Sequence, residues 1–114
     1  MCIPENPLQL EFRINISAKT LSVYRNGVLI NEYRVATGKE STPTPIGTFT
    51  IINKQLNPGG PYGTRWLGLS QKGYGIHGTN APESIGTAAS NGCIRMFNSD
   101  IEQLFDITNT GTTV

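Results

Sequence analysis

The stretch Ser90-Asn91-Gly92-Cys93-Ile94-Arg95-Met96 is the part of the sequence around which the rest of the chain is organised. It places a thiol directly after an Asn-Gly pair, which favours a turn, and directly before a strand-like run. A cysteine needs a base or a neighbouring cation to become a reactive thiolate at neutral pH. The chain contains one histidine, His77. We therefore predict that Cys93 is a nucleophile and that His77 is its partner.

The simpler interpretation of Cys93 is a small buried hydrophobic residue, as is common for cysteines in apolar runs. The accompanying histidine and the wider pattern described below favour the reactive interpretation. The other cysteine is Cys2. A disulfide between the two would consume the residue that best explains the chemistry, so we expect both cysteines to be free.

Residues on either side of Cys93 suggest a site for acyl transfer. The backbone amides of Gly92 and Cys93, presented by a turn that glycine permits, are candidate oxyanion donors. Arg95 lies two residues beyond Cys93, so on a strand it points to the same face, where its planar guanidinium suits a substrate carboxylate. The alternative for Arg95 is a surface ion pair. Ser90 can hydrogen-bond either a substrate or the loop itself, and Asn91 is a further substrate-binding candidate.

Upstream, hydrophobic alternation predicts strands. Residues 10–16 alternate apolar and polar, which indicates a half-buried strand. Two further strands, at residues 21–24 and 28–35, flank Arg25-Asn26-Gly27, and Asn-Gly supplies the positive φ angles of a tight hairpin turn. Residues 37–47 contain prolines that argue for an ordered loop, and the strand 48–52 follows it.

The middle of the chain is predicted to carry a loop and two more strands. Residues 53–65 are too rich in glycine and proline for regular structure, and we interpret them either as a flap over the site that carries Tyr62 or as a plain surface connection. Strands at residues 66–69 and 74–77 follow, and the second delivers His77 at its end. Trp66 is expected in the core or as a wall of the substrate cleft.

Helix is predicted to be scarce. Residues 81–90 suggest a short helical turn and a loop that folds back to bring Cys93 to His77. A capping box at Ser99-Asp100-Ile101-Glu102, with Ile101, Leu104 and Phe105 on one face, predicts one longer helix. We therefore predict a mostly β fold, a single domain over residues 1–114, with two packed or barrel-like sheets and one or two short helices.

Composition excludes several classes of function. The 114 residues fit one domain, and 9 basic against 8 acidic residues give a net charge of +1, so there is no basic face for nucleic acid or anionic lipid. One histidine and two distant cysteines do not supply the three or four ligands of a zinc site. We expect no metal, no cofactor and a monomer. Residues 1–7 do not read as a signal peptide, and no run is long enough for a membrane span.

Several motifs together resemble the catalytic domain of the L,D-transpeptidases (YkuD type). His77-Gly78 is followed by Cys93 sixteen residues after the histidine, in Ser-x-Gly-Cys-Ile-Arg-Met. The other motifs are Thr37-Gly38-Lys39 leading into Thr42-Pro43-Thr44-Pro45-Ile46-Gly47-Thr48-Phe49, Arg65-Trp66-Leu67-Gly68-Leu69, and Gly111-Thr112-Thr113-Val114. The resemblance covers about residues 12–114. It departs from the family pattern at Asn91, where many members carry a second histidine.

The resemblance implies a cysteine acyltransferase that remodels bacterial peptidoglycan. Cys93 would attack a tetrapeptide stem at its third residue and release the terminal D-alanine, and the side-chain amine of another stem, or water, would accept the acyl group. His77 would hold the thiolate as imidazolium and then act as acid and base, with the carbonyl of Gly78 orienting its ring. Carbapenems would be inhibitors. The expected location is the cell wall, reached without a signal peptide in this sequence, either as a spore-wall protein or after loss of a leader.

Two rival classes remain open. A papain-like or NlpC/P60-like peptidase also uses cysteine and histidine, but there the cysteine precedes the histidine, whereas here His77 comes first. A non-catalytic module that binds the cell wall is compatible with the sequence, because sequence alone does not bring Cys93 and His77 into contact.

Overall fold

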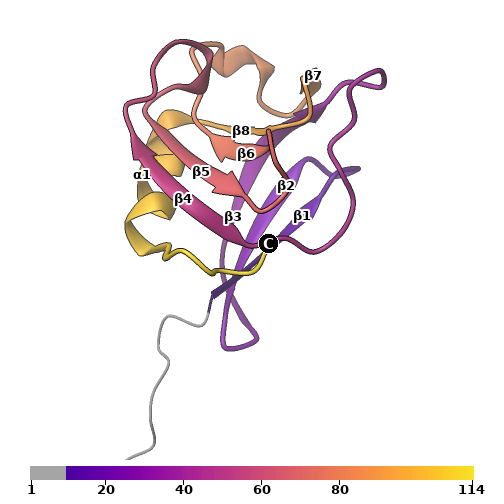
Figure 1. The fold of residues 1–114 in the computed structure, drawn as a ribbon. Helices are drawn as coiled ribbons and strands as arrows, with labels where there is room; N and C mark the ends of the chain where they lie inside the picture. The colour runs from indigo at the N-terminus through magenta and orange to yellow at the C-terminus, as the bar shows by residue number, and fades with distance from the viewer. Residues whose placement is uncertain (1–9) are drawn as a thin grey trace, which may run out of the picture.

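The computed structural model describes residues 10–114 and contains one continuous sheet with little helix (Figure 1). Its spatial order is β1-β2-β3-β8-β6-β5-β4, and β7 pairs separately with β3. The strands are β1 (Leu10–Asn15), β2 (Thr20–Arg25), β3 (Val28–Gly38), β4 (Ile51–Leu56), β5 (Arg65–Leu69), β6 (Gly75–His77), β7 (Ala88–Ser90) and β8 (Ile94–Met96). Cys2 lies outside the described residues.

The first three strands form an antiparallel meander, as the sequence predicts. In β1, Leu10 and Phe12 are buried, Ile14 is half-buried, and the residues between them are more exposed, which matches the alternating pattern. The turn between β2 and β3 places Asn26 at φ 51° and Gly27 at φ 84°. Both central residues therefore have the positive φ angles that a two-residue hairpin turn needs.

The sheet curls into a half-barrel, and the C-terminal residues lie between its two edges (Figure 1). Phe12 of β1 donates its backbone N–H to the carbonyl of Thr113 at 2.9 Å, and Ile51 of β4 donates to that of Thr112 at 2.9 Å. Of the two arrangements that the sequence allowed, the barrel-like one is confirmed, because the strands form one curled sheet instead of two packed sheets.

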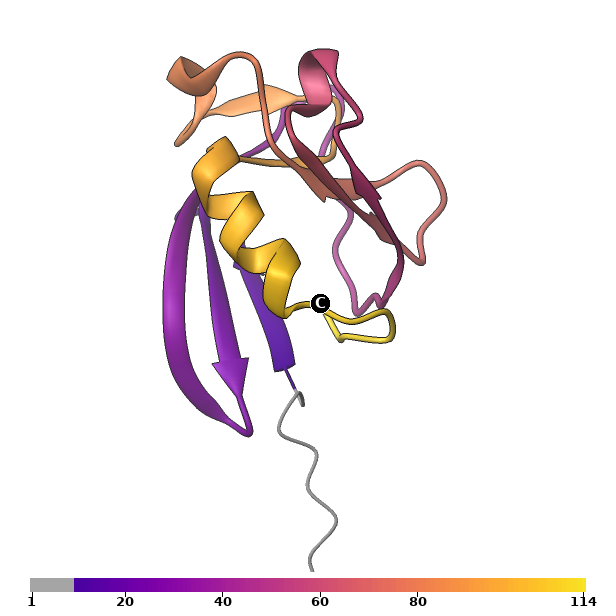
Figure 2. The same ribbon diagram turned by 90° about the vertical axis from the view of Figure 1, so that its left-hand side faces the viewer.

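One α-helix, α1 (Asn98–Ile107), covers the opening between the β1–β3 limb and the β4–β6 limb of the curled sheet (Figure 2). Ile101 and Leu104 are fully buried and Phe105 is half-buried, so the predicted apolar face is confirmed. The predicted capping box is wrong: the helix begins at Asn98, one residue before Ser99, and no side chain caps its first turn. Glu102 instead accepts a hydrogen bond from the Thr64 hydroxyl at 2.8 Å.

The core lies inside the curl, between the sheet and α1. It consists of apolar side chains from β1, β2, β3, β4, β5, β6, β8 and the helix: Leu10, Phe12, Leu21, Val23, Tyr33, Val35, Ile51, Leu67, Leu69, Ile76, Ile94, Met96, Ile101 and Leu104. Because β6 and β8 each supply buried residues next to His77 and Cys93, the core fixes the backbone on which those two residues sit.

The region after the β2–β3 hairpin differs from the sequence prediction in several places. The strand expected at residues 48–52 instead spans Ile51–Leu56. The backbone N–H and carbonyl of Phe49 are both hydrogen-bonded to Val114, so Phe49 does not pair within that strand. Part of the expected 53–65 loop is therefore strand, and the rest contains the short 3₁₀ helix η1 (Gly60–Tyr62). The helical turn expected near residue 82 is confirmed as η2 (Pro82–Ser84), but it is followed by β7, which the sequence did not predict.

Within residues 10–114, no helix combines the length and the apolar character needed to cross a bilayer.

Candidate active site

Two adjacent parallel strands bring the predicted nucleophile and base to one end of the sheet. His77 is the last residue of β6, and its register partner on β8 is Arg95. Cys93 is the residue immediately before β8. Parallel strands need a crossover connection, and the segment between His77 and Cys93, which contains η2 and β7, provides it. The sixteen-residue spacing in the sequence is therefore the length of this crossover.

A cleft of about 190 Å³ opens at this end of the sheet. Most of the residues that the sequence singled out line it: Tyr62, His77, Ser90, Asn91, Cys93 and Arg95. Pro61 and Gly73, which the sequence did not single out, line it as well. Pro61 and Tyr62 come from η1, so the loop interpreted as a flap does form part of the wall of the cleft. Gly78, Gly92 and Trp66 do not line it.

His77 is held by its backbone neighbour. The ring nitrogen Nδ1 lies 2.5 Å from the carbonyl oxygen of Gly78, and the side chain is only 3% exposed. A carbonyl oxygen can only accept a hydrogen bond, so Nδ1 carries the proton in the neutral ring and Nε2 keeps a free lone pair. This arrangement is the one expected for Gly78 as the group that orients His77, and it makes Nε2 the nitrogen that can accept a proton.

Two aromatic rings enclose His77. Trp66 on the neighbouring strand β5 stacks on the imidazole with a centroid distance of 5.5 Å and an interplanar angle of 12°. Tyr62 meets both rings edge-on, at 5.1 Å from the imidazole centroid and 5.4 Å from that of Trp66. Trp66 therefore shields the face of His77, and Tyr62 both lines the cleft and fixes the ring from the side.

Burial disfavours charge on His77. It lowers the pKa of His77 to about 4, the hydrogen bond to Gly78 opposes this shift, and the positive charge of Arg95 adds to it. Burial likewise raises the pKa of the half-buried Cys93 thiol, while the Gly75 backbone and the Arg95 charge act in the opposite direction. Burial therefore favours the neutral thiol and the neutral imidazole, in the direction opposite to the thiolate–imidazolium pair that the resemblance implies.

The thiol of Cys93 points to the turn before β6. Its Sγ lies 3.7 Å from the carbonyl oxygen of Gly73, which is a weak hydrogen-bond distance for sulfur. Gly73 has φ 85°, so this turn needs a residue that tolerates the left-handed region. The sequence analysis missed Gly73, although the Lys72-Gly73 pair is an ordinary turn signal.

Ser90 acts on the loop that carries Cys93. Its hydroxyl donates to the carbonyl of Cys93 and accepts the backbone N–H of Gly92 at 3.0 Å. Of the two roles open to Ser90, the structure therefore displays the loop-holding one. The backbone N–H of Gly92, a candidate oxyanion donor, is therefore already hydrogen-bonded to the Ser90 hydroxyl. Gly92 itself has φ 113°, and a Cβ there would collide with the ring of Tyr74.

Arg95 faces the cleft, and within residues 10–114 no carboxylate pairs with it. It donates a hydrogen bond to the hydroxyl of Ser84, 3.3 Å from Nη1. Among residues 10–114 the ion pair found is Arg13 with Glu11, far along the sequence from this site. The guanidinium is therefore available to a negatively charged ligand. Asn91 lies on the exposed rim of the same cleft.

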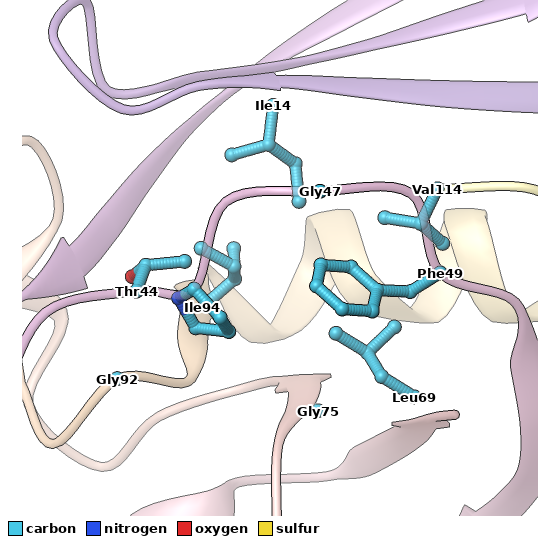
Figure 3. A pocket seen from close by; sticks show the side chains of 10 residues that line it. Ile14, Thr44, Gly47, Phe49, Leu69, Gly75, Gly92, Ile94 and Val114 are labelled. Carbon is cyan, nitrogen blue, oxygen red and sulfur yellow. The ribbon is translucent and has the colours of Figure 1, made fainter. Parts of the chain in front are cut away.

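A second, smaller cavity lies behind the Cys93 loop. Its volume is about 40 Å³, and Figure 3 shows the side chains of Ile14, Phe49, Leu69, Ile94 and Val114 around it, with Gly75 and Gly92 at its edge. None of the lining residues is titratable, and the one hydroxyl among them, on Thr44, accepts the backbone N–H of Gly38 at 2.8 Å. This cavity therefore belongs to the apolar interior, and the chemistry resides in the cleft at Cys93.

Comparison with known proteins agrees with this arrangement. The family model of the YkuD L,D-transpeptidase catalytic domain matches residues 11–114. A Bacillus licheniformis protein provisionally named L,D-transpeptidase YkuD is 50% identical over 111 residues, which cover 96% of this chain and 67% of the relative.

Solved structures are similar as well. The solution structure of the catalytic domain of the E. faecium L,D-transpeptidase superposes with a TM-score of 0.80 at 27% identity, covering 96% of this chain and 98% of that one. The L,D-transpeptidase LdtMt1 in complex with imipenem gives a TM-score of 0.80 at 25% identity, covering 92% of this chain and 57% of that one. The chain thus spans about three fifths to two thirds of the length of the two longer relatives. It belongs to the L,D-transpeptidase catalytic domain (YkuD) family.

Proposed function

We propose that the protein is a cysteine acyltransferase that cross-links or attaches peptidoglycan stem peptides through a thioester on Cys93, with L,D-carboxypeptidase activity when water is the acceptor. The observation that carries the proposal is the cleft itself. Its lining contains the thiol of Cys93, the one imidazole of the chain and an arginine that has no carboxylate partner among residues 10–114. His77 and Arg95 lie on adjacent strands, and Cys93 immediately precedes β8. Membership of the family supports the same reaction class.

We propose that the first half-reaction starts from the neutral thiol and the neutral imidazole, the forms that burial favours. The sulfur of Cys93 attacks the carbonyl carbon of the third stem residue as its proton passes to Nε2 of His77. The oxyanion that forms needs N–H donors, for which the Cys93 and Gly92 amides are the candidates, and Gly92 serves only after release from Ser90. The bond to the terminal D-alanine then breaks, His77 returns the proton to the leaving amine, and a thioester remains.

The second half-reaction uses the same groups in reverse. Nε2 of His77 takes a proton from the incoming side-chain amine, the amine attacks the thioester carbonyl, and the Cys93 sulfur leaves and recovers its proton. The proposal gives Arg95 the task of binding a substrate carboxylate, with Tyr62 and Asn91 forming the walls of the cleft. Peptidoglycan stems lie outside the cytoplasm, so we also propose the cell wall or the spore wall as the site of action.

The test is release of D-alanine from a tetrapeptide stem together with formation of the joined product. The wild-type chain is expected to release D-alanine and, with a second stem present, to yield the cross-linked dimer. Cys93→Ser is expected to yield neither, because a serine hydroxyl is less acidic and less nucleophilic than a thiol. The matched control is Cys2→Ser, which removes the other thiol. A chain that binds the stem but releases no D-alanine would be a cell-wall-binding module and not a transpeptidase.

A further inference from the structure

Asn98 lies outside the cleft, yet its side chain ties together the two loops on either side of His77. The oxygen Oδ1 accepts the backbone N–H of Thr64 at 3.2 Å and that of Thr79 at 3.1 Å. The nitrogen Nδ2 donates to the carbonyl of Thr79 at 3.0 Å. An uncharged amide is the group that can both accept and donate in this way, and it does so from the first residue of α1.

Two glycines allow the loops to approach this amide. A Cβ added at Gly63 would overlap Asn98 Oδ1 and the backbone of Gly78 and Thr79, and a Cβ added at Gly78 would overlap the same oxygen. Gly63 also has φ 66°, which favours glycine. The sequence therefore provides space on both sides for Asn98 to contact backbone groups directly.

The contact with Thr79 bears on His77 through one peptide plane. The N–H of Thr79 and the carbonyl of Gly78 belong to the same planar peptide unit. When Oδ1 accepts that N–H, the direction of the Gly78 carbonyl is fixed, and this carbonyl is the acceptor for Nδ1 of His77. Rotation of this peptide would therefore break the Asn98 contact and the His77 contact together.

The contact with Thr64 acts on the other side of the imidazole. Thr64 follows Gly63 at the end of the loop that carries η1, and the Tyr62 ring of η1 meets His77 edge-on at 5.1 Å. The carboxylate of Glu102, one helical turn after Asn98, accepts the Thr64 hydroxyl at 2.8 Å and fastens the same residue to α1. The start of the helix thus anchors both the hydrogen-bond acceptor of His77 and the aromatic wall beside it.

We propose that Asn98 is a positioning residue, which by holding the Gly78–Thr79 peptide fixes His77 as the tautomer with the proton on Nδ1 and leaves Nε2 free for the proton of Cys93. This inference rests on the proposed role of His77 as the base. It assigns to α1 a direct part in organising the reaction, beyond covering the core.

The experiment reads the tautomer of His77 directly. Because His77 is the chain's one histidine, the ¹⁵N chemical shifts of a single imidazole report it without assignment ambiguity. The shifts are recorded at pH 7 for the wild type, Asn98→Ala and Asn98→Asp. The matched control is Asn109→Ala, which removes an exposed asparagine beyond the other end of α1. Acylation by a carbapenem and D-alanine release are measured on the same samples.

The expected result for Asn98→Ala is a mixture of the two tautomers and acylation slower by roughly tenfold to a hundredfold, with the effect in kcat more than in KM. Asn98→Asp keeps an oxygen that accepts the Thr79 N–H, so it should retain the single Nδ1–H tautomer even if the alanine variant fails to fold. Asn109→Ala should match the wild type.

A folded Asn98→Ala variant with the wild-type tautomer, or an Asn98→Asp variant with mixed tautomers, would overturn the proposal. The proposed function and the positioning role of Asn98 can be disproved separately. If the wild type shows no acylation but Asn98→Ala changes the tautomer, the proposed function is wrong and the positioning contact stands. If the wild type acylates and the tautomer is unchanged in Asn98→Ala, the positioning role is wrong and the proposed function stands.

Discussion

At the scale of single residues, the buried imidazole makes stability depend on pH. The pKa of His77 is about 4 in the folded protein and 6.5 for the unperturbed side chain. Between these values the unfolded chain binds more protons than the folded one, so the free energy of unfolding falls as the pH drops from 6.5 toward 4 and levels off below. The difference between the two pKa values corresponds to about 3 kcal/mol in total.

Chemical denaturation at pH 7 and pH 4.5 measures this effect. The wild type should lose about 2 kcal/mol more than His77→Gln between the two pH values, because glutamine cannot take up the proton. Equal losses in both proteins would mean that other groups, and not His77, set the acid sensitivity.

Arg95 gives a second prediction at the residue scale. Arg95→Lys keeps the charge but removes the planar fork that binds a carboxylate through two parallel hydrogen bonds. We expect kcat/KM for D-alanine release to fall by at least about tenfold, with an unchanged melting temperature, since within the described part of the chain the hydrogen bond found for this side chain is the one to Ser84. Unchanged kinetics would remove Arg95 from substrate binding.

Asn91 gives a third prediction at the residue scale. It lines the same cleft and is exposed. Because His77 is the chain's one imidazole, general acid and base chemistry falls on it, so Asn91→Ala should keep most of the activity, while His77→Gln should lose roughly 10²–10⁴-fold. Loss of activity in Asn91→Ala as large as in His77→Gln would refute the mechanism with a single imidazole.

Local patterns were sufficient to single out Cys93, His77 and Arg95, which line one cleft, because a Gly-Cys turn, a strand-end histidine and a two-residue strand spacing are short-range features. They could not predict Gly73 or Asn98. Gly73 reaches Cys93 from twenty residues away, and Asn98 acts on backbone groups of residues 64 and 79. Such contacts exist only once the strands have been placed side by side.

At the scale of secondary structure, one lysine hydrogen-bonds to the C-terminal end of α1. Lys54 on β4 donates to the carbonyls of Phe105 at 2.8 Å and Thr108 at 2.7 Å, and its Nζ lies 4.2 Å from the centroid of the Phe105 ring. The last carbonyls of a helix lack intrahelical partners and carry partial negative charge. This ammonium group therefore supplies both a hydrogen-bond donor and a compensating positive charge.

Lys54→Met should therefore destabilise the protein. Methionine keeps the apolar stem but removes the ammonium donor from both carbonyls, although the carbonyl of Phe105 still accepts the backbone N–H of Thr108 at 3.3 Å. The loss should cost about 1–2 kcal/mol in the free energy of unfolding. Denaturant midpoints are compared with those of Lys72→Met, an exposed lysine in the turn before β6. If both variants lose the same amount, the contact of Lys54 with the helix end contributes nothing measurable.

The elements that the sequence predicted well are those with their own local signals. Asn26-Gly27 determines the β2–β3 hairpin, and the spacing of Ile101, Leu104 and Phe105 determines the helix face. The displaced strand β4 and the absent capping box both depend on distant partners: Phe49 is taken up by Val114, and Glu102 by Thr64. Propensity therefore gave way to tertiary hydrogen bonds at these positions.

At the scale of the whole molecule, the curl of the sheet and the place of the C-terminus could not be predicted from strand patterns. Both a barrel and a sandwich bury one face of each strand, so alternation does not distinguish them. Residues 112–114 decide the matter by hydrogen-bonding to β1 on one side and to Phe49 and Ile51 on the other. This closure leaves the end of the sheet at β6 and β8 open as the cleft.

The measurement that tests the central claim most directly is the intact mass of the protein after incubation with imipenem. The claim is that Cys93 is the nucleophile, so the wild type and Cys2→Ser should each gain the mass of one ring-opened imipenem, Cys93→Ser should gain none, and digestion should place the adduct on the peptide that contains Cys93. An unmodified wild type, or an adduct that persists in Cys93→Ser, would contradict the account.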